Sequence, residues 1–242
     1  MRIVIASDLH GNAQALDVLP REYDQLWILG DLVNYGPNPG AVVEFVRQHA
    51  NVVIRGNHDN AIGCHADPQC SEPYRKMAEA MGRFTERELS GDDKEYLANL
   101  PLTATVDVSG SHFFLCHATP SDPLFSYCPP ESDRWYGEVN GTDCDVLLCG
   151  HTHIPFVREI DGTRIANPGS LGQPKIGRPE ACYAVWENGR LTLHAEPYDY
   201  ERTISTIRAL GTLGVTSDIK QALIHVLRSG GALTPSKVEA IR

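Results

Sequence analysis

The segment DVLLCGHTHIPF, residues 145–156, joins an apolar run to a polar end, and this combination indicates the fold. The run is short enough for a buried strand, and the glycine after it introduces two histidines separated by one threonine. Ligands of open α/β sheets bind beyond the carboxyl ends of the strands, so a strand that ends in such side chains predicts this class of fold.

Four earlier apolar runs end in the same way. Asp8 and His10 follow RIVIAS, Asp31 follows LWILG, Asn57, His58 and Asp59 follow VVIRG, and His117 follows FFLC. Segments of helix length, 11–19 and 39–49, separate the first three runs, which predicts a parallel or mixed sheet. Because the strand ends of such a sheet meet at one edge, we expect these polar side chains to converge.

The remaining chain predicts helices, a loop and two hairpins. Residues 71–100 are rich in helix formers and include a capping signal, Ser90 with Asp93, so they predict two helices beside the site. Residues 119–142 contain four prolines and two glycines and predict a long loop. Asp161-Gly162 and Asn188-Gly189 predict hairpin turns, and 199–210 and 216–228 predict terminal helices.

The composition narrows the class of protein and its partners. The 242 residues carry a formal net charge of −10 without a basic run, which disfavours binding to long nucleic acids. No apolar run reaches the ~20 residues of a membrane span, and we find no signal peptide, so we expect a cytoplasmic protein without membrane contact. The seven scattered cysteines fit reduced thiols better than disulfides.

The polar strand ends carry side chains that bind metals. They offer carboxylates, imidazoles and one amide but no cysteine, and mixed nitrogen and oxygen ligands suit Mn, Fe or Zn. One four-coordinate zinc would leave several of them unused. Two ions that share a carboxylate would use them, and two ions ~3.5–4 Å apart form a known clamp for displacement at phosphorus.

These motifs resemble those of the calcineurin-like metallophosphoesterase family. They are Asp8-Leu9-His10, Gly30-Asp31, Gly56-Asn57-His58-Asp59, His117 and Gly150-His151-Thr152-His153, in the family's order. The stretches GDLVNYGPNP and NPGSLGQPKIGRP are similar to a small bacterial and archaeal phosphodiesterase-type branch. His117-Ala118 departs from the common His-Gly of the family but keeps the ligand.

The resemblance implies a fold and a domain organisation. The fold class is α/β, a two-sheet αββα sandwich of mixed strands with flanking helices. Residues 1–242 would form a single domain with a helical cap-like insertion at about 60–100 and C-terminal helices at about 199–242.

The resemblance also implies the roles of individual residues. Asp8, His10, Asp31 and His153 would hold one divalent metal ion, and Asp31, Asn57, His117 and His151 would hold the other. His58 would stabilise the transition state or protonate the leaving oxygen, with Asp59 orienting its ring. Two divalent ions, two aspartates and one hydroxide sum to about +1, which would attract a phosphate ester to an acidic protein.

The implied activity is that of a binuclear-metal-dependent phosphoesterase. We expect a phosphodiesterase or small-nucleotide hydrolase in which a metal-bridging hydroxide attacks phosphorus in line, acting on a small phosphate ester. A phosphoprotein phosphatase and a non-catalytic metal-binding scaffold of the same fold remain alternatives. The identity of the metals, among Mn, Fe and Zn, and the oligomeric state stay open.

Several further residues have two interpretations in the sequence. Asn34, Tyr35, Lys175 and Arg178 are candidate substrate contacts, but turn packing or a solvated loop explains them equally well. We expect structural roles for the isolated histidines 49, 112, 194 and 225. The segment from Cys64 to Cys70 lacks a standard zinc spacing, so we expect an ordinary loop over the site.

Overall fold

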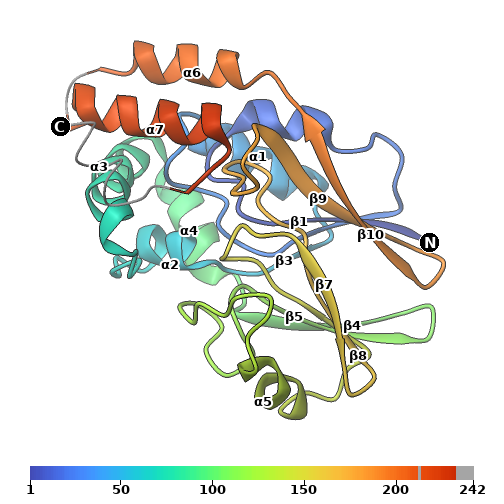
Figure 1. Cartoon of the computed structure of the whole chain (residues 1–242). Helices are drawn as coiled ribbons and strands as arrows, with labels where there is room; N and C mark the ends of the chain where they lie inside the picture. Colours follow the sequence, from blue (N-terminus) through green and yellow to red (C-terminus); the bar gives the residue numbers. More distant parts are fainter. Residues whose placement is uncertain (212–213, 233–242) are drawn as a thin grey trace.

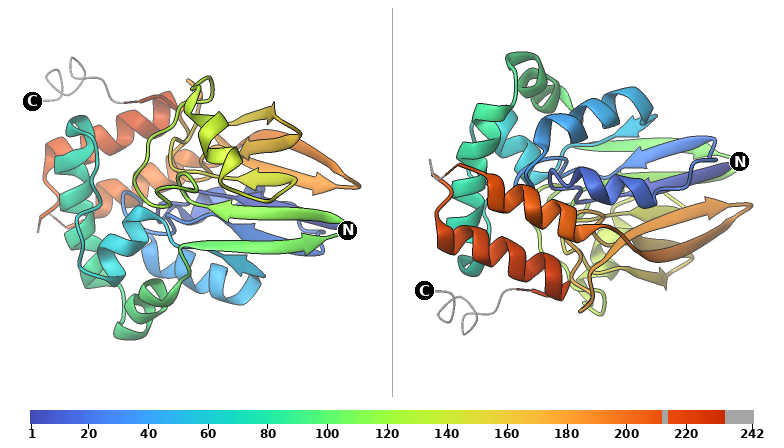
Figure 2. Two further views of the ribbon diagram at one scale, coloured as in Figure 1. Left: turned by 90° about the horizontal axis from the view of Figure 1, so that it is seen from below. Right: turned by 90° about the horizontal axis from the view of Figure 1, so that it is seen from above.

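The computed structural model describes residues 1–211 and 214–232, except for the side chains of Glu72 and Pro73. Two mixed sheets of five strands each pack face to face, as Figure 1 shows. The first sheet has the order β10-β9-β1-β2-β3 and the second has the order β4-β5-β6-β8-β7. The predicted α/β sandwich of mixed strands is confirmed, with helices on its outer faces and at one end (Figures 1 and 2).

The first sheet is parallel where the sequence predicts strand–helix alternation. It consists of β1 (Arg2–Ala6), β2 (Gln25–Ile28), β3 (Val52–Val53), β9 (Glu180–Glu187) and β10 (Arg190–Pro197). β1 and β3 both run parallel to β2, whereas β9 is antiparallel to β1. The chain therefore leaves β1, β2 and β3 at the same edge of the sheet.

The second sheet repeats this parallel arrangement at its centre. It consists of β4 (Thr103–Val108), β5 (Ser111–Cys116), β6 (Val146–Leu148), β7 (Phe156–Ile160) and β8 (Thr163–Asn167). β5 and β8 both run parallel to β6. In Figure 1 the chain leaves β1 and β5 toward the same end of the sandwich, the end at which the helices α2, α3 and α7 gather.

An aromatic cluster fills the space between the two sheets. The buried Phe113 ring of β5 lies edge-to-face between two tryptophans, 5.1 Å from the Trp27 centroid and 5.0 Å from that of Trp186. Because Trp27 and Trp186 belong to the first sheet, these contacts join the sheets directly. Aromatic rings in this geometry add specific orientation to the burial of a large apolar area.

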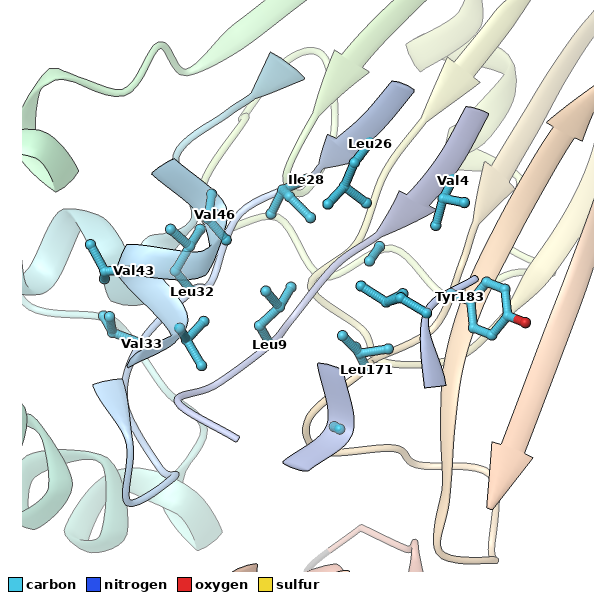
Figure 3. Close-up of a cluster of buried hydrophobic side chains, with 14 of the residues drawn as sticks. Val4, Leu9, Leu26, Ile28, Leu32, Val33, Val43, Val46, Leu171 and Tyr183 are labelled. Atoms are coloured by element: carbon cyan, nitrogen blue, oxygen red, sulfur yellow. The ribbon is translucent and has the colours of Figure 1, made fainter. Parts of the chain in front are cut away.

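A second apolar layer covers the outer face of the first sheet. The helix α1 (Pro39–His49) buries Val42, Val43 and Val46, and Figure 3 shows the last two beside Ile28 and Leu32. The segment predicted as a helix at 11–19 is instead a short 3₁₀ helix, η1 (Ala13–Val18). A segment of six residues closed by Pro20 is typical of 3₁₀ geometry, which occurs in short pieces.

Helices surround the end of the sandwich at which the polar side chains emerge. They are α2 (Asn57–Gly63), α3 (Glu72–Glu88), α4 (Gly91–Asn99), α6 (Tyr200–Ala209) and α7 (Ser217–Ser229). A separate apolar cluster packs α3 against α6 and α7, and it includes Tyr35 from the loop after β2. The two helices predicted in 71–100, the Ser90–Asp93 capping box and the terminal helices are confirmed.

Local turn chemistry was a good guide to the hairpins but not to the loop at 119–142. Asp161-Gly162 and Asn188-Gly189 have positive φ at both positions, as a tight hairpin turn requires, and they join β7 to β8 and β9 to β10. The predicted loop contains one helix, α5 (Arg134–Asn140), which buries Trp135 and Val139 against the second sheet. This tertiary burial outweighs the turn signals of the prolines and glycines.

None of the described helices combines the length and the apolar character that crossing a membrane requires. The single-domain organisation with a cap-like insertion stays a prediction, and the last ten residues of its C-terminal part, 233–242, lie outside the described residues.

We expect the change Phe113→Ala to lower the free energy of unfolding by about 3–5 kcal/mol, because it opens a cavity between the two sheets. Chemical denaturation measures this value. Leu102→Ala is the matched control, since Leu102 is 38% exposed, and its cost should stay below about 1 kcal/mol. Equal costs for the two changes would contradict the role of this cluster as the link between the sheets.

Candidate metal centre and active site

The strand ends bring the seven predicted ligands together. We refer to this candidate set as the metal centre; its members are Asp8, His10, Asp31, Asn57, His117, His151 and His153. Six of them are buried, and His151 is partly exposed. They come from loops after β1, β2, β5 and β6 and from the first residue of α2, so segments separated by more than a hundred residues meet here.

One group of ligand atoms surrounds the carboxylate of Asp8. The Nε2 atom of His153 lies 3.2 Å from Asp8 Oδ1 and 3.1 Å from His10 Nε2. His10 Nε2 is also 3.9 Å from Asp8 Oδ1 and 3.8 Å from Asp31 Oδ2. The ligand atoms of Asp8, His10 and His153 lie within 4.8 Å of one another, close enough to hold one ion.

A second group surrounds the other side of Asp31. His117 Nε2 lies 3.3 Å from Asp31 Oδ2 and 3.1 Å from Asn57 Oδ1. The Nδ1 atom of His151 lies 3.2 Å from the same Asn57 oxygen. Asp31 Oδ2 therefore faces both groups, and the structure brings together the residues of each predicted set.

Contacts behind the imidazoles fix which nitrogen faces the metal centre. The Nδ1 atoms of His10, His117 and His153 face the carbonyl oxygens of Val33, Leu29 and Gln173 at 3.2, 2.7 and 2.7 Å. A nitrogen that faces a carbonyl carries a proton, so in each of these rings Nε2 is the nitrogen that could ligate an ion. The Asn57 amide likewise donates to Pro68 O at 2.7 Å, which leaves its oxygen free to ligate.

The protonation chemistry of this donor set fits divalent cations. Burial lowers the pKa of His151 to about 3 and holds that of His10 well below its usual value, so both rings are neutral near pH 7. Burial opposes protonation of His117 as well, but the Asp31 carboxylate outweighs it and raises the pKa of His117 to about 10, so a cation would displace a proton from its Nε2. Within the described part of the chain, Asp8 Oδ1 is buried without a hydrogen-bond donor, and a cation would satisfy it.

The backbone of the ligands is held in an uncommon conformation. Asp8, His10, Asp31, His151 and His153 all have positive φ, between 47° and 64°. Left-handed backbone is unfavourable for residues with a side chain and concentrates at functional sites. Position 56 must be glycine because of close packing. A Cβ there would lie 2.1 Å from Asp31 Oδ1, which is closer than two such atoms can approach.

The predicted role of Asp59 is wrong in one respect. Its carboxylate does not hold the His58 ring; Oδ2 accepts from Asp31 N at 2.8 Å and from Gly56 N at 3.0 Å, and Oδ1 accepts from Leu32 N at 2.8 Å. The family resemblance implied the ring contact, but the helical backbone of α2 directs neighbouring side chains apart. Asp59 instead ties the loop after β2 to the start of α2.

Asn34 holds the His58 ring, so the structure gives Asn34 a positioning role in place of the predicted substrate contact. The Asn34 amide nitrogen lies 2.8 Å from His58 Nδ1 and donates to Ala78 O at 3.2 Å, while its oxygen accepts from Tyr35 N at 2.8 Å. These partners fix the orientation of the amide. His58 Nδ1 therefore accepts a hydrogen bond, and its proton lies on Nε2.

A cavity of about 370 Å³ opens above the metal centre. Tyr35 and Lys175 line it, as predicted substrate contacts should, whereas Arg178 is absent from its described lining and pairs with Glu180. Sequence reasoning missed other lining residues, which are Gln69, Cys70, Ser71, Tyr74, Phe125, Tyr127, Gln173 and Ala232. The position of these residues in loops was the available signal, but loop shape decides which of them reach the cavity.

The isolated histidines and the Cys64–Cys70 segment behave largely as expected. His49, His112 and His194 contact Phe45, Asp107 and Tyr183, away from the metal centre. Cys64 is an exposed free thiol, and Cys70 is a free thiol that lines the cavity. The segment is therefore a loop over the site.

Comparison with known proteins assigns the family. The sequence model of the calcineurin-like phosphoesterase superfamily domain matches residues 1–189. The chain belongs to this superfamily. As a calcineurin-like phosphoesterase it is a metal-dependent phosphoric ester hydrolase.

Relatives of this calcineurin-like phosphoesterase cover most of its length. Phosphodiesterase YfcE from Escherichia coli (strain K12) is 27% identical over 213 residues, 81% of this chain and 92% of that protein. The crystal structure of a metallophosphoesterase from Sphaerobacter thermophilus is 29% identical, with a TM-score of 0.78 over 95% of this chain and 99% of that one. A hypothetical protein from Pyrococcus horikoshii OT3 shares the fold at 20% identity, with a TM-score of 0.81 over 96% and 99% of the two chains.

We expect Asp59→Asn to lower the free energy of unfolding by about 2–4 kcal/mol, because an amide cannot accept from all three backbone N–H groups. Thermal and chemical denaturation measure this loss. Asp17→Asn is the control and should cost less than about 1 kcal/mol, since it makes the same change at an exposed position. An Asp59 variant of unchanged stability would restore the interpretation that Asp59 acts only on the His58 ring.

Proposed function

We propose that this phosphoesterase is a phosphodiesterase or small-nucleotide hydrolase that uses two divalent cations. The observation that carries the proposal is Asp31 Oδ2, which lies 3.8 Å from His10 Nε2 in one ligand group and 3.3 Å from His117 Nε2 in the other. A carboxylate oxygen shared by two groups suits a pair of ions with one common ligand. Bound cations would activate water and neutralise charge at phosphorus.

His58 is the residue suited to proton transfer. Burial opposes its protonation, but Asp31 and Cys70 outweigh burial and raise the pKa of His58 to about 9. The contact with Asn34 leaves Nδ1 as an acceptor and so places the proton on Nε2, the nitrogen that faces Cys70 Sγ at 3.5 Å on the cavity wall. As water adds to phosphorus and the ester bond breaks, His58 would protonate the leaving oxygen, and the attacking water would restore that proton.

The size and charge of the site favour small substrates. A cavity of about 370 Å³ is near the lower end of ordinary ligand pockets, about 300–1,000 Å³, and suits a single nucleotide unit. The net charge of −10 disfavours a long polyanion but permits a small ester to reach a locally positive centre. The related phosphodiesterase YfcE supports the same class of activity for this chain.

Two other functions from the sequence are less well supported. A non-catalytic scaffold does not require a positioned His58, yet the Asn34 amide holds the His58 ring in one orientation. A phosphoprotein phosphatase would need room for a peptide, whereas α3 and α7 pack beside the cavity. The cytoplasmic location stays a prediction.

Removal of metal tests the proposed reaction. We expect the protein to hydrolyse bis(p-nitrophenyl) phosphate in the presence of Mn²⁺, to lose at least about 100-fold of its rate after chelation, and to recover it when Mn²⁺ is restored. Release of p-nitrophenolate gives the rate, and metal analysis gives the number of ions per chain. A rate that is indifferent to the chelator would overturn the proposal.

The shared ligand has its own test in Asp31→Asn. We expect this change to lower the hydrolysis rate by about three or more powers of ten and to lower the metal content, because both groups lose a charged ligand. Asp17→Asn removes the same charge at an exposed position and should leave both quantities unchanged. Normal turnover with normal metal content in the Asp31 variant would contradict a shared ligand.

A further inference from the structure

One wall of the cavity carries two polar residues that have no role in the proposed reaction. Gln173 and Lys175 lie two positions apart in the loop between β8 and β9, and both line the cavity. The backbone of this loop is tied to the metal centre, because Gln173 O faces His153 Nδ1 at 2.7 Å. The two side chains are therefore held beside the reacting group.

Lys175 is a partly buried cation without an ion pair to any of the described side chains, which do not include that of Glu72. Its Nζ lies 4.9 Å from the centroid of the Tyr74 ring. Burial lowers the pKa of Lys175, while Asp8, Cys70 and Asp31 act in the opposite direction without touching it. A cation that is held on an aromatic face and lines a cavity is suited to an anion brought by a ligand.

Gln173 adds an independent sign of a ligand at the same wall. Its side chain is buried, with 3% exposed, yet Oε1 has no hydrogen-bond partner among the described residues. A buried polar atom without a partner is destabilising, and a hydrogen bond from a bound molecule would relieve this. Oε1 can only accept and so suits a hydroxyl of the ligand, whereas the amide N–H groups of Gln173 can donate to a phosphoryl oxygen.

Lys175 offers a positive charge to a second anionic group. The scissile group of a phosphodiester would lie at the ligand set, whereas Lys175 lies outside that set on the cavity wall. Its charge is therefore available to another group of the same substrate. A further phosphoryl group on the substrate would balance it.

Aromatic side chains form the remaining wall and indicate what carries these phosphoryl groups. Tyr74, Phe125 and Tyr127 line the cavity, and the Tyr127 centroid lies 6.2 Å from that of His151. Tyr127 is 51% exposed, so its ring is available for contact with a ligand. Bases of nucleotides stack on aromatic rings placed in this way.

We propose that Lys175 and Gln173 form a subsite for a second phosphoryl group, and that the enzyme prefers nucleotide derivatives that carry this group beside the scissile one. This inference rests on the proposed function and deepens it. Lys175 determines specificity by pairing with the second phosphoryl group, while the scissile one lies at the metal centre. The aromatic wall receives the base.

Two p-nitrophenyl esters test the inference kinetically. One is the ester of thymidine 5′-phosphate, and the other is the terminal ester of thymidine 5′-diphosphate, which adds one phosphoryl group. We expect Lys175→Gln to lower kcat/KM for the diphosphate ester by about 10–100-fold, and that for the monophosphate ester by less than about 3-fold. Arg178→Gln removes the same charge from the same loop and should change neither value, and Lys175→Arg should retain most of the preference.

Binding provides a readout that does not depend on turnover. Calorimetry on the Mn²⁺-loaded protein compares adenosine 5′-(α,β-methylene)diphosphate with AMP, and we expect Lys175→Gln to weaken only the former by about 10-fold or more. Circular dichroism checks that the variants are folded. If Lys175→Gln is unfolded, Lys175→Arg still tests the inference, because it keeps the positive charge and should retain most of the preference for the diphosphate ester.

The outcomes separate the inference from the proposed function. Equal losses for both esters and both ligands would overturn the subsite, because Lys175 would then serve the scissile group itself. Metal-dependent hydrolysis of both esters with no effect of Lys175→Gln would overturn the inference and leave the proposed function standing. If the protein hydrolyses neither ester, both the inference and the proposed function are wrong.

Discussion

Two buried carboxylates tie the end of β2 to the start of α2, and the metal centre depends on this reciprocal link. Asp59 accepts from the backbone N–H of Asp31 and Leu32, and Asp31 Oδ1 in turn accepts from the backbone N–H of His58. The two segments cannot move apart without leaving charged oxygens unpaired in the interior, which is costly. The link also fixes Asp31 in left-handed backbone, so that Oδ2 faces both ligand groups.

The two sheets supply the rigid frame for this link. Phe113 joins them through Trp27 and Trp186, and parallel strands in each sheet release their polar ends at the same side. Ligands held by packed strands need little further adjustment when a cation binds, and backbone carbonyls behind the imidazoles set their orientation in advance. The fold therefore sets the positions and orientations of these side chains before a ligand binds.

Helices and loops complete the site around the metal centre. Asn34 holds His58 from the loop after β2, while Tyr74 of α3 and Tyr127 of the long loop line the cavity. The metal centre supports the reaction class, and these surrounding residues would select the substrate. The proposed subsite of Gln173 and Lys175 belongs to this second set, because it lies beside the ligands but holds none of the metal-binding atoms.

The sequence by itself determined the fold class, the hairpins and the candidate ligands, because each depends on local pattern: apolar runs, Asp-Gly and Asn-Gly turns, and polar residues at strand ends. Only the tertiary structure decided that Asp59 anchors backbone and that Asn34 holds His58, since both contacts join segments more than twenty residues apart. It also decided that α5 forms within a proline-rich segment, where burial of Trp135 outweighs local propensity. Partners across a fold depend on three-dimensional packing, which the order of residues along the chain does not display.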